Sequence, residues 1–365
     1  MLIVALFLKT DYYPLIDEPT NHLDMQGRML LTDYLAYKDG FLLVSHDRYL
    51  LDGCVDHIVS INPQDVRVNK GNYSVWRQQM EFENEFEGRR KENLKREIKH
   101  LHHAAQQRRS GSLAKEKEKS GAFDKGRIGH LAAKQMQRAL SIETRIQKNI
   151  HAKEALLKNE EKKRQLKITT HRQQPGALLT INNLMIERGG KKVIRNLSLQ
   201  IYPGDRVAIT GSNGAGKTTL FDTISGRLQP TSGILKIPAH RKISRSFQEP
   251  LWNSGNLREK LLASSIEETQ FRQFMSVYGI ARDVFEQPLE TFSQGQLKKV
   301  DLIRSMMEPT DLLIWDEPMN YIDVLSREQI EEAILSNEPT LLFTDHDRYF
   351  VENIASKLID LDQLS

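Results

Sequence analysis

The chain has 365 residues, of which 39% are hydrophobic and 27% are charged, and its formal net charge is +4. This composition excludes a collagen-like, mucin-like or wholly disordered chain, and the length allows two domains of roughly 150 residues each. Cys54 is the only cysteine, no apolar run approaches the ~20 residues that span a bilayer, and Leu2–Leu8 lacks the flanks of a signal peptide. We therefore expect a cytoplasmic protein with no membrane partner and no intrachain disulfide.

Two short blocks in the first 50 residues recur near the end of the chain. Leu15–Asp24 (LIDEPTNHLD) is followed by Ser45–Tyr49 (SHDRY), and Leu313–Asp323 (LIWDEPMNYID) is followed by Asp345–Tyr349 (DHDRY). The acidic pairs of the two long blocks lie 299 residues apart, and the histidines of the short blocks lie 300 residues apart. Matching content at matching spacing indicates a duplicated domain.

Residues 77–172 are predicted to form a basic helical hairpin. Residues 87–167 contain 23 Lys or Arg against 10 Asp or Glu, and residues 64–174 contain no proline. Helix-forming residues with apolar positions at helical spacing occupy two runs, which are separated by a Gly- and Ser-interrupted segment at 110–129. Such a break predicts an antiparallel pair of helices. A solvated helix pair without a specific partner is the competing interpretation, but the one-sided charge favours a polyanionic partner.

The clearest chemical motif follows a short predicted strand at Val207–Thr210. Gly211–Thr218 (GSNGAGKT) matches G-x-x-x-x-G-K-[ST] and leads into a helix-like stretch. Glycines allow successive backbone N–H groups to curl around phosphates, and the helix N-terminus adds positive charge. We expect Lys217 to reach the β- and γ-phosphates and Thr218 to bind Mg²⁺. The predicted loop contacts are Gly211, Ser212, Asn213, Gly214, Ala215, Gly216, Lys217, Thr218 and Thr219.

A second apolar strand, Leu312–Trp315, brings two carboxylates to its end. Asp316 is the expected carboxylate on the Mg²⁺ side, and Glu317 is placed to polarise an attacking water. Adjacent acids at a strand end also occur as surface charge, but the distance of 105 residues from Gly211 and the repeated motif favour a catalytic role.

The segment Ser293–Gln296 (SQGQ), 23 residues before the acidic pair, resembles the signature motif of ABC ATPases. Asn320–Asp323 is similar to the D-loop of that family, His346 to its switch histidine and Gln248 to its Q-loop. The resemblance implies that Gln248 contacts nucleotide and Mg²⁺. The implied catalytic residues are Glu317, His346, Glu18 and His46, and the further nucleotide contacts are Gln248, Asp316, Ser293, Gly295 and Gln296.

Two such blocks joined by a charged linker, without a membrane segment, resemble the ABC-F proteins, and Gly71–Ser74 (GNYS) is also similar to them. Residues 119–126, 128–130 and 132–134 resemble the Lsa/Vga-type antibiotic-resistance group, whose members bind the ribosome and free it from drugs at the peptidyl-transferase centre. The resemblance implies ATP and Mg²⁺ as cofactors, no obligate transmembrane subunit, and the ribosome as a partner contacted through residues 87–167. Near the hairpin tip we expect phosphate contacts from Arg108, Arg109, Lys115, Lys117, Lys119, Lys125 and Arg127, and base stacking by Phe123 and His130.

The implied fold class is α/β, with ABC-type P-loop nucleotide-binding domains in tandem joined by a long α-helical hairpin. Residues 1–76 would be the C-terminal remnant of a first cassette, residues 77–172 the linker, and residues 173–365 a complete second cassette. With the 299-residue repeat, the phosphate loop and signature serine of the first cassette would lie before residue 1. The sequence therefore predicts an N-terminally truncated family member with impaired turnover, because composite ATP sites would lack one half within a single chain.

Some positions depart from the family pattern. Gln294 and Phe292 stand where Gly and Leu are usual in the signature, and Arg188 replaces the adenine-stacking aromatic expected before Gly189. A guanidinium plane also stacks on adenine, and a surface charge without a ligand is the competing interpretation of Arg188. Two other functions stay open: an RNA- or ribosome-binding remnant without useful ATPase activity, and a relative that acts on branched DNA. ATP turnover tests the first, and salt-dependent binding to ribosomes or to duplex DNA tests the second.

Overall fold

The computed structural model describes residues 2–8, 12–21, 23–61, 65–118, 166–170, 175–247 and 249–364. The chain forms two compact units, one made of Met1–Tyr73 with Gln165–Ser365 and the other of Ser74–Arg164. In these ranges, no helix combines the length and the apolar character that crossing a membrane requires.

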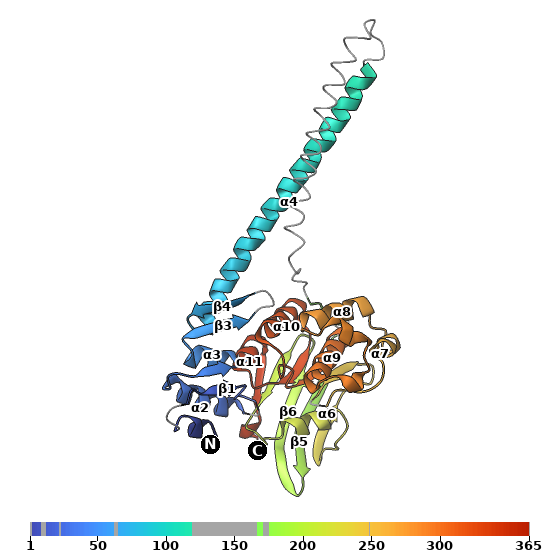
Figure 1. Ribbon diagram of the computed structural model, residues 1–365. Helices are drawn as coiled ribbons and strands as arrows, with labels where there is room; N and C mark the ends of the chain where they lie inside the picture. Colours follow the sequence, from blue (N-terminus) through green and yellow to red (C-terminus); the bar gives the residue numbers. More distant parts are fainter. Residues whose placement is uncertain are drawn as a thin grey trace. The chain divides into compact units, whose positions relative to one another are not determined.

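The larger unit contains a five-stranded parallel sheet in the order β12-β7-β11-β10-β9 (Figure 1). Its strands are β7 (Arg206–Thr210), β9 (Ile243–Ser246), β10 (Leu312–Asp316), β11 (Leu341–Thr344) and β12 (Lys357–Asp360). Every residue of β10 and β11 is buried, as is usual for parallel strands covered on both faces. The expected α/β class is confirmed.

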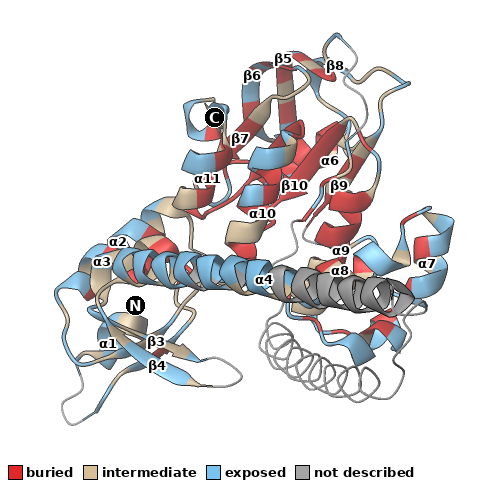
Figure 2. Ribbon diagram, turned by 90° about the horizontal axis from the view of Figure 1, so that it is seen from above, coloured by how far each residue is buried: buried red, intermediate tan, exposed pale blue. Residues whose placement is uncertain are grey.

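The two faces of this sheet contact different elements. Leu313 and Trp315 of β10 pack with the helices of one face, whereas Leu312 and Ile314 pack with a three-stranded antiparallel sheet on the other. Figure 2 shows the buried residues concentrated in this central sheet. Helix α6 (Lys217–Ile224) packs on the same side as the antiparallel sheet. The other helices are α7 (Leu257–Ala263), α8 (Glu268–Val277), α9 (Gln294–Met307), α10 (Val324–Asn337) and α11 (Arg348–Ile354), with 3₁₀ turns at Arg282–Glu286, Leu289–Thr291 and Leu361–Gln363. The antiparallel strands are β5 (Leu179–Arg188), β6 (Lys191–Ile201) and β8 (Ser232–Lys236).

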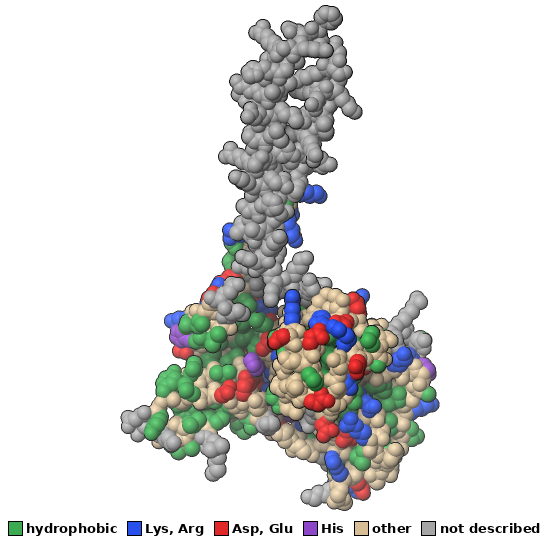
Figure 3. Space-filling view, turned by 45° about the vertical axis from the view of Figure 1, so that its right-hand side comes forward, with side chains coloured by type: hydrophobic (Ala, Val, Ile, Leu, Met, Phe, Trp, Pro, Cys, Tyr) green, Lys and Arg blue, Asp and Glu red, His purple; other side chains and the backbone are tan. Residues whose placement is uncertain are grey.

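The N-terminal segment of the larger unit repeats part of this arrangement. Its elements are α1 (Leu2–Leu6), β1 (Leu15–Asp17), α2 (Met25–Ala36), β2 (Leu42–Val44), α3 (Arg48–Cys54), β3 (His57–Ile61) and β4 (Val66–Lys70). Strand β1 pairs with β2 in parallel, as β10 pairs with β11, and β3 pairs with β4 in an antiparallel hairpin. Ile16 is buried with Leu35 and Leu50 between the strands and the helices. Leu42 and Val44, in contrast, are 48% and 52% exposed, and Figure 3 shows hydrophobic side chains gathered over this segment.

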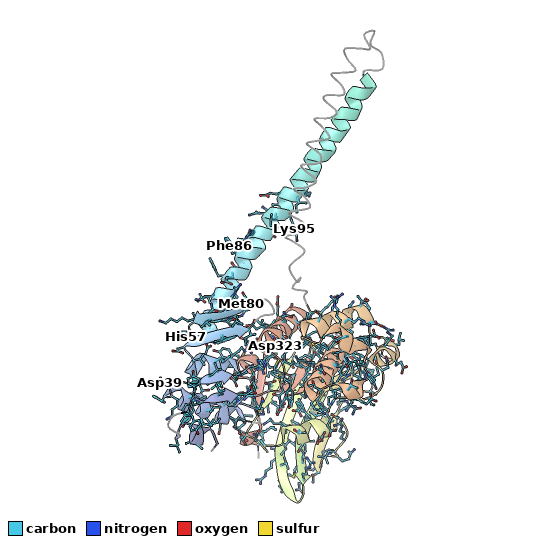
Figure 4. The ribbon with its side chains drawn as sticks, in the orientation of Figure 1. Asp39, His57, Met80, Phe86, Lys95 and Asp323 are labelled. Carbon is cyan, nitrogen blue, oxygen red and sulfur yellow. The ribbon has the colours of Figure 1, made fainter. Side chains whose placement is uncertain are left out.

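The described part of the smaller unit is one helix, α4 (Tyr73–Glu118), whose first residue belongs to the larger unit. Phe86, labelled in Figure 4 with Met80 and Lys95, is 62% exposed on it. The sequence predicts an interruption from Ser110 onward, and this boundary is wrong because the helix continues to Glu118. One glycine costs a helix only about 1 kcal/mol relative to alanine, and the surrounding Lys, Glu and Ala residues favour the helix. The predicted second helix and the tip residues Lys119, Phe123, Lys125, Arg127 and His130 lie outside the described residues.

Candidate functional site

The glycine-rich loop connects the end of β7 to the first turn of α6. Gly214 and Gly216 have φ values of 91° and 98°, in the left-handed region that favours glycine. A Cβ atom on Gly216 would lie only 2.4 Å from Cγ1 of Val193 on β6, whereas one on Gly214 would meet no atom within 4 Å. The loop therefore needs glycine at 216 for its backbone conformation and for its packing, so that its main chain curls tightly before α6.

Lys217 lies inside this curl. Its Nζ donates hydrogen bonds to the carbonyl oxygens of Gly211, at 2.7 Å, and Ser212, at 3.1 Å. Burial lowers the pKa of Lys217, against the opposing effect of nearby carboxylates that include Glu317 and Asp24. Thr218, the next residue, is exposed in the first turn of α6. The ammonium group is thus held where a phosphate in the loop would meet it, and the next residue, Thr218, is accessible.

Two carboxylates accept hydrogen bonds from amides of the loop. The backbone N–H of Ser212 donates to Asp362 Oδ2 at 2.8 Å, and that of Asn213 donates to Asp24 Oδ2 at 3.2 Å. Asp24 belongs to the N-terminal segment, where it also caps α2 through the N–H of Gly27 at 2.8 Å. The N–H groups of Gly27 and Asn213 lower the pKa of Asp24. The loop thus selects negative oxygens, and residues 189 positions apart meet at it.

Asp316 ends β10 in a buried position and accepts a hydrogen bond from Thr344 Oγ1 at 2.8 Å. Burial raises the pKa of Asp316, and the positive charges of Lys298 and Lys217 counter this effect. Nζ of Lys298 donates to the carbonyl oxygen of Asp316 at 3.0 Å and to that of Phe247 at 2.7 Å. The strand end that carries the acidic pair is therefore fixed by α9 and by β11.

Glu317 and His346, which are far apart in the sequence, meet in the structure. His346 Nε2 lies 3.2 Å from Glu317 Oε1, and Asn320 Nδ2 donates to Glu317 Oε2 at 2.7 Å. The hydrogen bond with His346 lowers the pKa of Glu317. Glu317 has a φ of 50°, an uncommon value for a residue with a side chain. Both carboxylate oxygens are therefore oriented, and the group is held in its ionised form.

Glu18 and His46 show the same arrangement in the N-terminal segment. His46 Nε2 lies 3.6 Å from Glu18 Oε1, and Glu18 has a φ of 42°. Burial raises the pKa of Glu18 and lowers that of His46. Lys299 of α9 and Asp323, which caps α10 and is labelled in Figure 4, act electrostatically on His46. The charge of a lysine in the helix that begins at the SQGQ segment is therefore felt at His46.

The predicted signature residues form the beginning of α9. Ser293 Oγ accepts from the N–H of Gln296 at 3.2 Å, and Gln296 Oε1 accepts from the N–H of Ser293 at 2.8 Å, which together make a capping box. A Cβ atom on Gly295 would lie 3.4 Å from Cβ of Tyr321. Ser293 thus bonds within its own helix rather than to the phosphate loop. Gln248 lies outside the described residues, and the buried flank at Phe247 is the nearest part of its segment that can be placed.

Sequence analysis missed the contacts that Asp24, Lys298 and Asp362 make at the site. Asp24 stands at the end of a repeated block, and its place directly before a helix is an N-cap signal. Lys298 gave no clear signal, because its neighbours at helical spacing on α9 include the polar residues Asp301 and Ser305 as well as Leu302.

Comparisons with known proteins agree with this geometry. A family model described as "ABC transporter" matches residues 194–320. The chain is 29% identical to the ribosome protection protein VmlR of Bacillus subtilis over 94% of this chain and 64% of the relative, and 26% identical to ABC transporter F family member 2 of Arabidopsis thaliana over 95% of this chain and 49% of the relative. A solved structure of RNase-L Inhibitor covers 98% of this chain and 59% of its own chain with a TM-score of 0.61 at 20% identity, which concerns the fold alone. The chain spans about half to two thirds of the length of these relatives.

Proposed function

Because the chain belongs to the ABC-F family of ATPases, we propose that residues 211–219 bind the phosphates of ATP and that Glu317 and His346 serve its hydrolysis. The observation that carries the proposal is the buried Lys217, whose ammonium group lies inside the glycine-rich curl with Nζ 2.7 Å from the Gly211 carbonyl. On phosphate binding this group would exchange two carbonyl partners for phosphate oxygens, which form stronger, charge-assisted hydrogen bonds.

The residues present fit a magnesium ion held together with the nucleotide. Within the described ranges, no cluster of three His, Cys, Asp or Glu residues is placed to hold a metal by itself. Thr218 and Asp316 would hold Mg²⁺ with phosphate oxygens as further ligands, and Mg²⁺ when bound neutralises charge on those oxygens. The buried Asp316 supplies a carboxylate whose pKa is already raised, so a nearby cation would favour its ionised form.

Glu317 is the residue that would act on the attacking water. Its lowered pKa keeps the carboxylate ionised, so that it can accept a hydrogen bond from water and orient it toward a phosphate. His346 and Asn320 each bind one carboxylate oxygen and fix its direction. We propose the corresponding roles for Glu18 and His46 at a second composite site, with Ser293, Gly295 and Gln296 as its signature residues. The electrostatic effect of Lys299 on His46 supports that pairing.

Lys217→Ala tests nucleotide binding. The charge-assisted contacts of a lysine are worth about 1.5–3 kcal/mol, so we expect a 10- to 150-fold weaker affinity for fluorescent ATP with Mg²⁺. Lys236→Ala, which removes an exposed lysine from β8, is the matched control and leaves the affinity unchanged. Equal affinities of the parent and Lys217→Ala would contradict the assignment. Glu317→Gln should retain affinity and lower turnover, which separates hydrolysis from binding.

We propose the ribosome as the partner of this ATPase, as in a ribosome protection protein, with residues 87–167 contacting RNA. The support is the excess of 23 Lys or Arg over 10 Asp or Glu in that segment, together with the name of the relative VmlR. If Z phosphates are neutralised, the logarithm of affinity falls with the logarithm of salt concentration at a slope of roughly −0.7Z to −0.9Z. The activity that corresponds to protection is the restoration of in vitro translation in the presence of a drug.

Neutralising the predicted tip tests this role. Replacing all four of Arg108, Arg109, Lys125 and Arg127 by Gln should weaken ribosome binding. It should also make the salt slope shallower, by an amount that corresponds to up to about four fewer neutralised phosphates. The control replaces four exposed cations of the larger unit, Lys192, Arg195, Lys236 and Arg282, with Gln. If the tip variant and the control variant bind ribosomes equally well and with the same salt slope, the linker acts only as a spacer. Tighter binding to branched DNA than to ribosomes would favour the DNA-acting alternative, and ribosome binding without ATP turnover would favour the RNA-binding one.

A further inference from the structure

Four charged side chains are buried together where the N-terminal segment meets α10 and α11. They are Arg48 of α3, Arg327 and Glu331 of α10, and Asp347, the residue before α11. Each of these side chains is at most 8% exposed, and they comprise two positive and two negative charges. Buried ion pairs contribute little net stability because desolvation opposes their attraction, but they favour one relative orientation of the groups. We call these residues the Arg48 cluster.

Asp347 is at the centre of the Arg48 cluster. Its Oδ2 accepts hydrogen bonds from Arg48 at 3.2 Å and from Arg327 at 3.0 Å, while its Oδ1 accepts from the N–H of Phe350 at 3.1 Å and caps α11. Burial by itself would raise the pKa of Asp347, but the two guanidinium groups lower it. Arg48 also donates to Glu331 Oε1 at 2.5 Å. Its Nε atom has no acceptor among the residues that can be placed, so the guanidinium depends on these two carboxylates.

The Arg48 cluster connects the main chain at both histidines. Asp347 directly follows His346, and Arg48 lies two residues after His46. Arg327 closes the connection, because the nitrogen that binds Asp347 also donates to the carbonyl oxygen of His46 at 2.9 Å. A movement of either histidine loop must therefore move the other loop or break a buried, charged hydrogen bond.

The internal repeat shows that this connection is one-sided. Arg348 occupies the position equivalent to Arg48, but it pairs with Glu352 of its own helix, and its side chain is 40% exposed. The position equivalent to Glu331 is Thr32, whose hydroxyl donates to the carbonyl oxygen of its own helix at Arg28. The ionic contact of Arg48 with Glu331 is thus not a duplicated feature of the two halves.

We propose that Arg48 is a positioning residue that acts through Asp347 to hold His346 at Glu317 and that links the His46 loop to the His346 loop. The proposal rests on the proposed ATPase function for its consequence, which is communication between the two Glu–His pairs. Arg48 itself touches neither pair. The effect of its replacement on turnover should therefore exceed its effect on nucleotide affinity.

The decisive measurement is the imidazole NMR spectrum of the nucleotide-free full chain, with signals assigned through His346→Gln and His46→Gln. In a chain that is otherwise unaltered, His46→Gln should shift the ring signals of His346. Glu331→Gln and Arg48→Met should each weaken that response to the part carried by Arg327, and Arg48→Lys should restore some of the loss. The control is Arg348→Met, which removes the equivalent arginine; its guanidinium lies 5.5 Å from the Tyr49 ring in the same contact region. This control should leave the response intact.

Turnover provides a second readout. Arg48→Met should slow it about tenfold, equivalent to about 1.4 kcal/mol in the barrier, with less than a twofold change in ATP affinity. If Arg48→Met does not fold, Glu331→Gln and Arg48→Lys decide the question by the same spectra. An unchanged His346 response in a folded variant, or an equal loss in Arg348→Met, would overturn the proposal. Because the spectra are recorded without nucleotide, failure of ATP binding would refute the proposed function and leave the coupling result standing.

Discussion

Replacing Lys298 with methionine should destabilise the larger unit much more than the loss of an ordinary lysine. The side chain of Lys298 is buried on α9, and its Nζ bonds the carbonyl oxygens of Phe247 and Asp316 at 2.7 and 3.0 Å. Methionine matches the length of the side chain but leaves both buried acceptors without a donor, at a cost of about 1–3 kcal/mol each. Part of this cost is offset because an ammonium no longer has to be buried. We therefore expect the free energy of unfolding to fall by about 2–4 kcal/mol.

Urea unfolding of Lys298→Met beside Lys299→Met measures the difference. Lys299 is the neighbouring lysine of α9, half-buried, with one hydrogen bond from Nζ to the carbonyl oxygen of Tyr278 at 2.8 Å. Its replacement should cost about 0.5–1.5 kcal/mol, the usual net value of one hydrogen bond. Lys298→Met should also raise the pKa of Asp316 further, because it removes one of the cations that oppose the effect of burial. Equal losses in the two variants, with no change in the slope of the unfolding curves, would refute the reasoning.

Two further predictions concern the acidic pair and the loop. His346→Ala should raise the pKa of Glu317, measured by carboxyl-carbon NMR, because the hydrogen bond that lowers it is lost. A lowered carboxylate pKa stabilises the folded state above about pH 4.5 and does so less at lower pH. The part of the difference in unfolding free energy between the parent and His346→Ala that comes from Glu317 should therefore shrink as the pH falls below that value. Gly216→Ala should destabilise more than Gly214→Ala: both impose a left-handed alanine at about 1–2 kcal/mol, but only the first places a Cβ against Val193. Similar thermal stabilities of the two alanine variants would show that Val193 moves aside without cost.

The proximity of several candidate site residues could be predicted from the sequence because these residues stand in short local motifs. Glu317 and His346 were assigned from two short blocks, and the structure places their side chains 3.2 Å apart. The repeat extended this assignment to Glu18 and His46, which lie 3.6 Å apart. The glycine-rich loop was recognisable because its backbone demands leave few alternatives to glycine at Gly216.

Contacts made by single side chains across the fold could not be predicted in this way. The hydrogen bond from Arg48 to Glu331 joins residues 283 positions apart, and the repeat fails at this point because Thr32 stands where a second glutamate would be needed. Lys298 looks like a surface residue until the carbonyls of the neighbouring strand end and loop are seen around it. Such partners depend on tertiary packing rather than on spacing along the chain.

Burial of the repeated strands shows the same dependence on surroundings. Strands β1 and β10 have similar sequences and similar parallel partners, yet Leu15 is 69% exposed while Ile314 at the equivalent position is 1% exposed. Strand β10 lies between β9 and β11, and its Ile314 packs against the antiparallel sheet on that face. Strand β1 pairs only with β2 among the residues that the structure describes. An apolar strand motif therefore predicts a strand and the direction of its acidic end, whereas the neighbouring strands and layers determine whether its side chains become core.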